Sequence, residues 1–223
     1  GVGTIVVKVL PEMKVNGPKQ RCAGQNGNYS SIIPGPNTPV PCNWSISPTG
    51  ASFIGGSTSV ASVNINWANA GSYTIKAVPS NPNLVCDSVL YTVIVHPIPV
   101  ISAITGKDTI CGGSTGVYAA VSNQSGVFTW NVTGGSFVGL NVNNDSVQIT
   151  WNANGPYSIV VTQLSAANNC PSLPFTKTVG VYPTPLINGP TIVCADNTET
   201  YTITNISAGF NWYVTPAQFG TVL

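Results

Sequence analysis

The chain has 223 residues, enough for about two domains, and 43% of them are hydrophobic, which suffices for packed cores. Only 6% are charged, against about 25% in an ordinary soluble protein. Seven Lys and Arg against six Asp and Glu form no basic stripe, which excludes nucleic acid as an electrostatic partner. No apolar run approaches the roughly 18 residues of a membrane span, so no membrane insertion is expected in this segment.

Landmark residues recur along the chain with a period of about 86 residues. Pro11, Pro97 and Pro183 are each 86 residues apart. After each proline the same types follow in the same order, Gly, Cys, Tyr, Trp and Phe: Gly17, Cys22, Tyr29, Trp44 and Phe53; Gly106, Cys111, Tyr118, Trp130 and Phe137; Gly189, Cys194, Tyr201, Trp212 and Phe219. Two units continue to a second Trp, a second Tyr and a later Cys: Trp67, Tyr73 and Cys86; Trp151, Tyr157 and Cys170. Such a register is the signature of a tandem array.

The register divides the chain into four parts. Residues 1–11 are expected to be the last strand of a preceding module, and residues 12–97 and 98–183 are expected to be complete modules, here called the first and second repeats. Residues 184–223 are expected to be the first part of a further module.

The most similar stretches are SVNINWANAGSYTIKAV at 62–78 and SVQITWNANGPYSIVVT at 146–162. Val63, Ile65 and Trp67 alternate with polar residues, as they do in a strand with one buried face. Turn residues follow, and a returning strand begins at Tyr73 or Tyr157. We predict a β-hairpin in each complete repeat, with its inward face in the core.

Each complete repeat shows about seven short strands separated by turn signals, which is typical of an antiparallel sandwich. Trp44, Trp130 and Trp212 are expected to point inward, and they resemble the strand-C tryptophan of immunoglobulin-like domains. Tyr73 and Tyr157 resemble the tyrosine corner. The predicted fold is all-β, made of tandem immunoglobulin-like antiparallel β-sandwich modules of about 86 residues.

Two segments carry a resemblance to a known family. GPTIVCADNTETYTITNISAGFNWYVTP and SVQITWNANGPYSIVVTQ resemble the PKD-like, immunoglobulin-like repeats of secreted Bacteroidota cell-surface adhesins, among them gliding-motility adhesins exported by type IX secretion. The resemblance implies export to the cell surface, tandem arrays, and adhesive or spacer roles. It brings no catalytic residues with it.

The chain contains six cysteines, a number that favours an oxidising compartment. Their matching landmarks make pairing within each repeat the simplest arrangement, namely Cys22 with Cys86 and Cys111 with Cys170. Cys194 is expected to pair beyond Leu223, and Cys42 is expected to be a small buried hydrophobe. Zinc is not expected, because no CxxC or His-bearing cluster exists.

Catalytic chemistry is not indicated, so neither an enzyme nor a cofactor is expected. His96 is the only histidine and reads as a residue of an inter-module linker. The carboxylates are scattered: Glu12, Asp87, Asp108, Asp145, Asp196 and Glu199. Sugar binding on aromatic platforms is the rival function, although Tyr182 and Tyr213 are the main aromatic residues that the core does not account for.

Three of the four aspartates are followed by Ser or Thr and then an apolar residue. Chance predicts about 0.3 such matches from this composition. The pattern resembles the O-glycosylation motif of exported Bacteroidota proteins, which implies covalent O-glycans on Ser88, Thr109 and Ser146. The alternative is that Asp-Ser and Asp-Thr are ordinary turn dipeptides.

The expected function is therefore that of a disulfide-stapled structural spacer in an exported tandem-repeat cell-surface adhesin or filament, which extends and displays adhesive regions in gliding or attachment. The alternative is a carbohydrate-binding module array of a secreted polysaccharide-acting enzyme. Expected partners are neighbouring modules of the same chain, with surface polysaccharide or other filament chains as further candidates.

Overall fold

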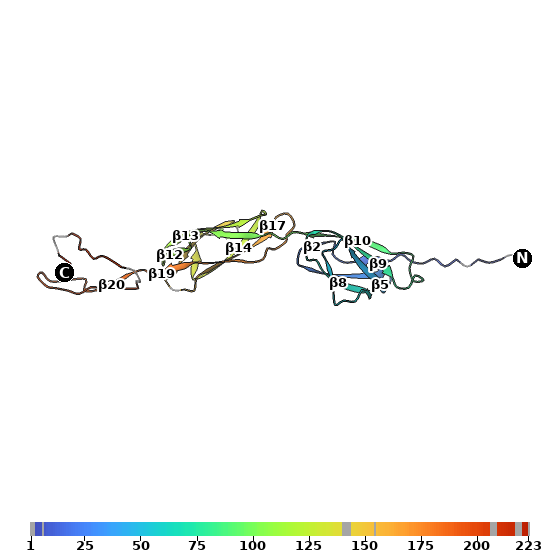
Figure 1. Cartoon of the computed structure of the whole chain (residues 1–223), viewed down its shortest axis with the longest axis horizontal. Coiled ribbons are helices and arrows are strands. Elements are labelled where there is room, and N and C mark those ends of the chain that lie inside the picture. Colours follow the sequence, from blue (N-terminus) through green and yellow to red (C-terminus); the bar gives the residue numbers. More distant parts are fainter. Residues whose placement is uncertain are drawn as a thin grey trace. The chain divides into compact units, whose positions relative to one another are not determined.

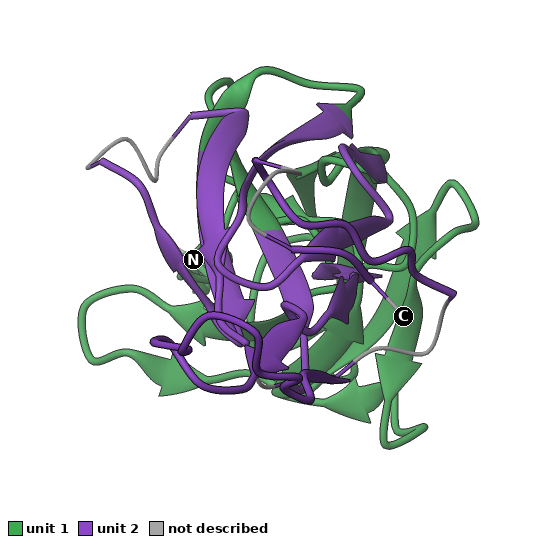
Figure 2. Cartoon of the chain, turned by 90° about the vertical axis from the view of Figure 1, so that its left-hand side faces the viewer, with its two compact units in different colours: residues 1–101, 122–127, 162–173 green, residues 102–121, 128–161, 174–223 purple. Residues whose placement is uncertain are grey.

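The computed structural model describes residues 3–5, 7–139, 144–153, 155–205, 209–216 and 220–222. Every regular element in this part is a β-strand (Figure 1), which confirms the all-β prediction. The chain divides into two compact units (Figure 2). Unit 1 contains residues 1–101, 122–127 and 162–173, and unit 2 contains residues 102–121, 128–161 and 174–223. Phe219, one of the repeat landmarks, lies outside the described residues.

The first repeat forms a sandwich of two sheets within unit 1. Its strands are β1 (Lys14–Asn16), β2 (Gln20–Cys22), β3 (Asn26–Ile33), β4 (Thr38–Pro39), β5 (Cys42–Ser47), β6 (Ser52–Ile54), β7 (Ser59–Val60), β8 (Ser62–Asn66), β9 (Gly71–Pro79) and β10 (Val89–His96). One sheet has the order β1-β3-β8-β6, with β4 added to β3, and the other has the order β2-β10-β9-β5-β7. The pairs within them are antiparallel except for β2 with β10, which is parallel.

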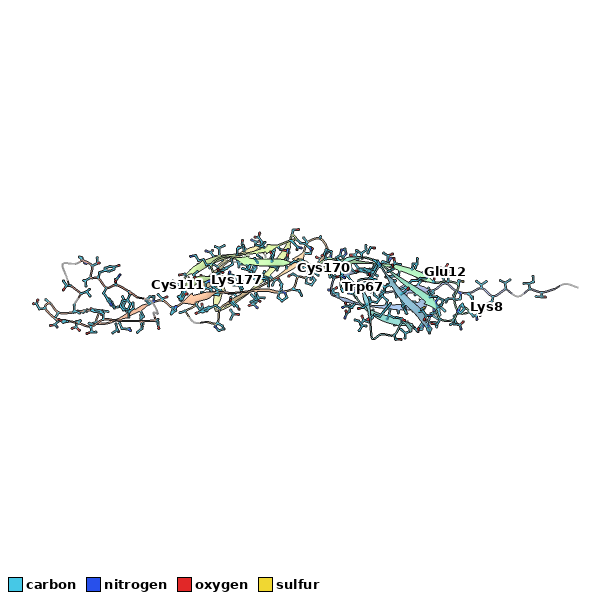
Figure 3. All side chains as sticks on the ribbon, in the orientation of Figure 1. Lys8, Glu12, Trp67, Cys111, Cys170 and Lys177 are labelled. Atoms are coloured by element: carbon cyan, nitrogen blue, oxygen red, sulfur yellow. A yellow bond between two sulfur atoms is a disulfide. The ribbon has the colours of Figure 1, made fainter. Side chains whose placement is uncertain are left out.

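Aromatic residues of the repeat register fill the core of this sandwich. Trp67 is fully buried (Figure 3), and Tyr29 meets its ring edge to face with 5.8 Å between centroids. Trp44 is also buried, as expected, and donates its indole N–H to the carbonyl of Val60 at 2.7 Å. The Tyr73 hydroxyl donates to the backbone carbonyl of the residue four positions earlier at 3.0 Å, which is the hydrogen bond of a tyrosine corner.

The second repeat builds the corresponding strands. They are β11 (Ile101–Thr105), β12 (Thr109–Cys111), β13 (Thr115–Ser122), β14 (Gly126–Thr133), β15 (Gly135–Phe137), β16 (Ser146–Trp151), β17 (Ser158–Ser165), β18 (Phe175–Thr178) and β19 (Gly180–Tyr182). The sheet orders are β11-β13-β16-β15, β14-β17-β18 and β12-β19. Trp130 and Trp151 are buried, as are their counterparts in the first repeat.

The predicted hairpins are wrong in one respect. The strands exist, and their burial alternates as expected, but β8 and β9 belong to different sheets, and so do β16 and β17. The turn between them therefore carries the chain from one sheet across to the other. Both strands still direct their apolar face into the same core, which is why their sequence pattern resembles that of a hairpin. An immunoglobulin-like sandwich has this crossing at the tyrosine corner.

The two terminal segments differ from the complete repeats. Residues 184–223 contain β20 (Leu186–Asn188) paired with β21 (Thr202–Thr204), and Trp212, which was expected to point inward, is 36% exposed. No second sheet covers it among the described residues of this segment. At the other end, residues 3–5 and 7–13 contain no strand, and the division of the chain at residues 11, 97 and 183 stays a prediction.

Candidate functional site

The described residues contain no group of three or more His, Cys, Asp or Glu side chains placed to hold a metal ion. His96 ends β10, and its Nε2 lies 3.2 Å from the side-chain oxygen of Gln20. Among the carboxylates, Asp108 forms an ion pair with Lys177. None of the described segments forms a helix with the length and hydropathy of a membrane span. The remaining chemistry of the chain lies in its cysteines.

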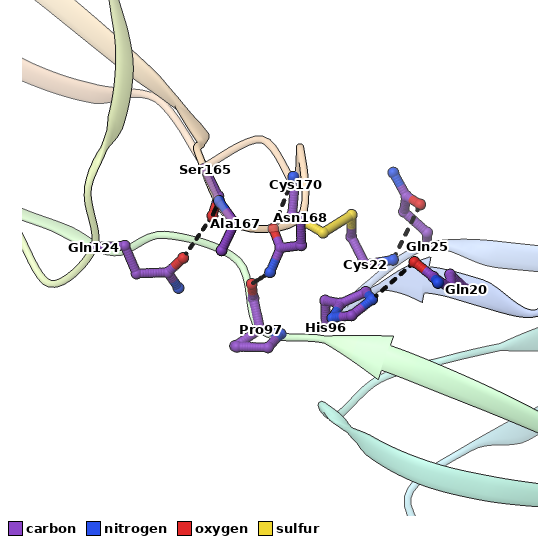
Figure 4. Close-up of a disulfide and its surroundings, with 10 residues drawn as sticks. All are labelled: Gln20, Cys22, Gln25, His96, Pro97, Gln124, Ser165, Ala167, Asn168 and Cys170. Atoms are coloured by element: carbon purple, nitrogen blue, oxygen red, sulfur yellow. Dashed lines mark hydrogen bonds between the residues drawn. A yellow bond between two sulfur atoms is a disulfide. The ribbon is translucent and has the colours of Figure 1, made fainter.

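The structure contains a disulfide between Cys22 and Cys170 (Figure 4). The two residues are 148 positions apart in sequence, and their Cα atoms are 5.6 Å apart, within the usual range for a disulfide. Cys86 and Cys111 are free thiols in the described part of the chain. The predicted pairs Cys22–Cys86 and Cys111–Cys170 are therefore wrong, because the bridge joins the first repeat to the second instead of closing each repeat on itself.

Strand pairing fixes the position of Cys22. It is the last residue of β2 and lies opposite His96 in the parallel pair with β10. The next two residues continue the contact, since the Ala23 N–H donates to the His96 carbonyl at 2.9 Å and the Gly24 N–H donates to the Trp67 carbonyl at 2.7 Å. Gly24 has a φ of 82°, a conformation that glycine adopts without steric cost.

A compact loop holds Cys170. Its N–H donates to the side-chain oxygen of Asn168 at 3.0 Å, and its carbonyl accepts the Ser165 N–H at 3.0 Å. Asn169 takes a φ of 56°, which Asn tolerates better than most residues. The Asn168 side chain also donates to the Pro97 carbonyl at 3.5 Å, a weak bond that places the loop beside the start of the second repeat.

A buried polar network lies next to this loop and is hydrogen-bonded to it. Gln163 is buried, receives a hydrogen bond from the Ser122 hydroxyl, and donates its side-chain N–H to the Gln124 carbonyl at 2.6 Å. Its backbone N–H donates to the Ser172 hydroxyl at 2.8 Å, and the Ser165 hydroxyl donates to the Gln124 side chain at 2.9 Å. A satisfied buried network of this kind rigidifies its surroundings, so it helps to fix the position of the loop that carries Cys170.

The other cysteines fall into two classes. Cys42 is fully buried with its Sγ 3.3 Å from the Met13 sulfur, and burial raises the pKa of its thiol, so the prediction that it is an unpaired buried hydrophobe is confirmed. Cys86, Cys111 and Cys194 are exposed thiols without a disulfide partner in the described chain. Cys86 contacts the N-terminal segment: its N–H donates to the Pro11 carbonyl at 3.2 Å.

The predicted glycosylation residues lie at or next to the first residue of a strand. Ser88 is half-buried and immediately precedes β10, and its N–H donates to the Asp87 carboxylate at 2.6 Å. Thr109 is exposed at the start of β12, and Ser146 is half-buried at the start of β16. Tyr182 and Tyr213, the expected leftovers of the core, are both exposed.

No protein-family model matches the chain, and no curated protein sequence matches it. Among solved structures, the chain is similar to the C-terminal 282-residue fragment of intimin, which was solved with the intimin-binding domain of the translocated intimin receptor. The identity is 16% and the TM-score 0.44, over 82% of this chain and 67% of that one. The fibronectin(III)-like modules of Clostridium thermocellum CbhA match at 17% identity and a TM-score of 0.35, over 76% and 94%. The tandem Ig repeats of Dlar match at 14% identity and a TM-score of 0.28, over 76% and 98%. Likeness at these identities concerns the fold alone.

Proposed function

We propose that the chain is a segment of an exported tandem-repeat cell-surface adhesin or filament, in which it acts as a disulfide-stapled spacer. The observation that carries this proposal is the Cys22–Cys170 bridge, which joins a strand of one repeat to a loop of the next. A binding module needs a surface for its ligand, whereas a spacer needs its successive modules to stay connected. The bridge meets the second need directly.

The same bond supports the proposed compartment. Disulfides persist outside the cytosol, where no thiol pool reduces them. The composition is also compatible with an exported protein. Only 6% of the residues are charged, so solubility depends on neutral polar groups and on any attached glycan. Within this proposal residues 12–97 and 98–183 are the modules, and the terminal segments belong to further modules of the same kind.

Surface exposure and ligand binding test the proposal separately. Antibodies raised against residues 1–223 are expected to label intact cells of the source organism, and proteolysis of intact cells is expected to remove the label. Labelling that requires permeabilised cells would contradict export. The recombinant chain is expected to leave a polysaccharide array unbound. Specific binding to one polysaccharide class would instead favour a carbohydrate-binding array.

A further inference from the structure

Cys22 and Cys111 occupy the same place in successive repeats. Cys22 ends β2 opposite His96 of the parallel strand β10, and Cys111 ends β12 opposite Tyr182 of the parallel strand β19. In both cases the residue after the cysteine donates its N–H to the carbonyl of that opposite residue, at 2.9 and 2.8 Å. Cys22 is in a disulfide, whereas Cys111 (Figure 3) is an exposed thiol with the same backbone support.

Cys86 and Cys170 are likewise equivalent, and each lies in a loop beside the proline that immediately precedes its own repeat. The loop of Cys170 contacts Pro97 through Asn168, and Cys86 contacts Pro11 through its own N–H, where Pro11 and Pro97 are 86 residues apart in the repeat register. The Cys86 thiol also points at the carbonyl just before Pro11, at 2.8 Å. In the bridged case, the residue just before Pro97 is the one that lies opposite Cys22.

The segment that Cys86 contacts forms no strand in its described residues, 3–5 and 7–13, whereas its equivalent is β10. Val7 and Val9 are 76% and 87% exposed, whereas their counterparts Val93 and Val95 in β10 are 0% and 2% exposed. Apolar side chains at these positions are therefore buried when a whole repeat surrounds them. Such a repeat, placed before this one, would set its early cysteine, the equivalent of Cys22, opposite Leu10. Leu10 is the residue whose carbonyl the Cys86 thiol already contacts.

From these equivalences we propose that every early cysteine of the array, at the position of Cys22 and Cys111, bridges to the late cysteine of the following repeat, at the position of Cys86 and Cys170. Cys111 then pairs with a late cysteine in the repeat after it, and Cys86 pairs with an early cysteine in the repeat before it. This inference rests on the proposed tandem array. Each new bond joins two thiols, which lose two protons and pass two electrons to a disulfide oxidant of the glutathione class, itself reduced to two thiols.

The bridges made in this way overlap along the sequence. The loop closed by Cys22 and Cys170 contains Cys111, from which the next bridge starts. Each complete repeat thus carries one half of a bridge at its beginning and one half of another at its end. We call this series of overlapping bridges the ladder. The exposed thiols Cys86 and Cys111 each belong to a ladder bridge whose other cysteine lies in a neighbouring repeat, and Cys42 takes no part because it is buried.

A fusion of two copies tests the ladder without the parent protein. Residues 1–183 followed directly by residues 12–223 preserve the repeat register, because Pro183 replaces Pro11 before Glu12. In this fusion Cys111 of the first copy faces Cys86 of the second copy. The protein is refolded with oxidised and reduced glutathione, alkylated under denaturing conditions, and its monomer fraction is digested without reduction.

The fusion carries eleven cysteines, and two copies of the Cys22–Cys170 bridge alone would leave seven thiols for alkylation. The ladder predicts five alkylated thiols and a new peptide joining Cys111 to Cys86, which the monomer of the single chain does not give. Replacing Cys111 by Ser in the first copy only is the matched control, and it should restore one alkylated Cys86 and abolish the joined peptide. Seven alkylated thiols in the unmodified fusion would overturn the ladder. This readout does not depend on where the protein resides in the cell, so it fails separately from the proposed function.

Discussion

The indole N–H of Trp151 donates to the hydroxyl of Tyr118 at 3.1 Å, and the two rings meet edge to face with 5.8 Å between centroids. Trp67 and Tyr29 repeat the ring geometry at 5.8 Å, yet the Trp67 Nε1 atom has no hydrogen-bond partner among the described residues. The Tyr29 hydroxyl donates instead to the Pro18 carbonyl at 3.0 Å. The buried indole N–H of this aromatic pair thus has an acceptor in the second repeat and none among the described residues of the first.

We expect Tyr118→Phe to lower the free energy of unfolding of unit 2 by about 1–3 kcal/mol, because it leaves the buried Trp151 N–H without an acceptor. Tyr29→Phe removes a single hydrogen bond to a carbonyl that is less buried, and a loss of about 0.5–1.5 kcal/mol is expected. Hydrogen exchange of the amides of β16 and β8 measures each unit by itself. The loss for Tyr118→Phe is expected to exceed that for Tyr29→Phe, and equal losses would contradict the assigned role of the Trp151 bond.

Alkaline pH is expected to weaken unit 1. Burial raises the pKa of Tyr29 to about 12 from 10.0, and burial also raises the pKa of Tyr91 in the same unit. The folded state holds the phenolic proton more tightly than the unfolded state, so this contribution to stability is full below pH 10.0 and is lost as the pH rises towards about 12. Urea titrations across this range, with tyrosinate absorbance recorded in parallel, test the effect. Tyr29→Phe should remove part of the pH dependence.

Removing the disulfide should destabilise unit 1. Cys22→Ser or Cys170→Ser is expected to cost about 2–5 kcal/mol, since the bond constrains a long loop in the unfolded chain. Cys86→Ser is the matched control, because it replaces an exposed free thiol of the same unit. Denaturant unfolding of oxidised protein compares the three. A Cys170→Ser variant as stable as Cys86→Ser would show that the bridge does not form.

Thiol reactivity should separate the four free cysteines. Cys86, Cys111 and Cys194 are exposed and should react rapidly with an alkylating reagent, whereas Cys42 is buried and has a raised pKa, so it should react only on unfolding. Mass spectrometry of timed samples gives the rate at each residue. Rapid alkylation of Cys42 in the folded protein would argue against its place in the core.

Protein isolated from its source cells is expected to carry extra mass on Ser88, Thr109 and Ser146. These hydroxyls follow Asp87, Asp108 and Asp145, and Thr109 is exposed on its strand. Replacing each Asp by Ala keeps the hydroxyl but removes the motif, so the mass should fall by one glycan per replacement. Unmodified hydroxyls at all three positions in the native material would end this proposal.

The core could be predicted from the sequence because buried apolar residues alternate with exposed polar residues along a strand. Trp67 directly follows β8 and Tyr73 lies on β9, strands whose apolar residues alternate, and both are buried as expected. The same alternation does not say which sheet a strand joins, because a crossing between sheets and a hairpin both direct alternate side chains inward. That is why β8 and β9 were expected to pair and do not.

The disulfide could not be predicted because the repeat register gives the position of a cysteine within a repeat but not the repeat of its partner. Loop entropy does not decide either. Separations of 64 and 148 residues differ by only about 0.7 kcal/mol in the chain-entropy model. The choice depends on the loop that holds Cys170, whose turn at Asn169 and buried Gln163 network form only in the folded protein. No sequence pattern at Cys22 indicates that loop.

The covalent bridge also changes how the chain responds to tension. The 148 residue steps between Cys22 and Cys170 would extend over about 500 Å if they were pulled straight. A pulling force applied at both ends of the chain passes through the disulfide instead. The segment between the two cysteines is therefore not extended, even if its hydrogen bonds break. Only residues outside the bridge can be drawn out. A reducing agent therefore adds the enclosed residues to the part of the chain that tension can extend.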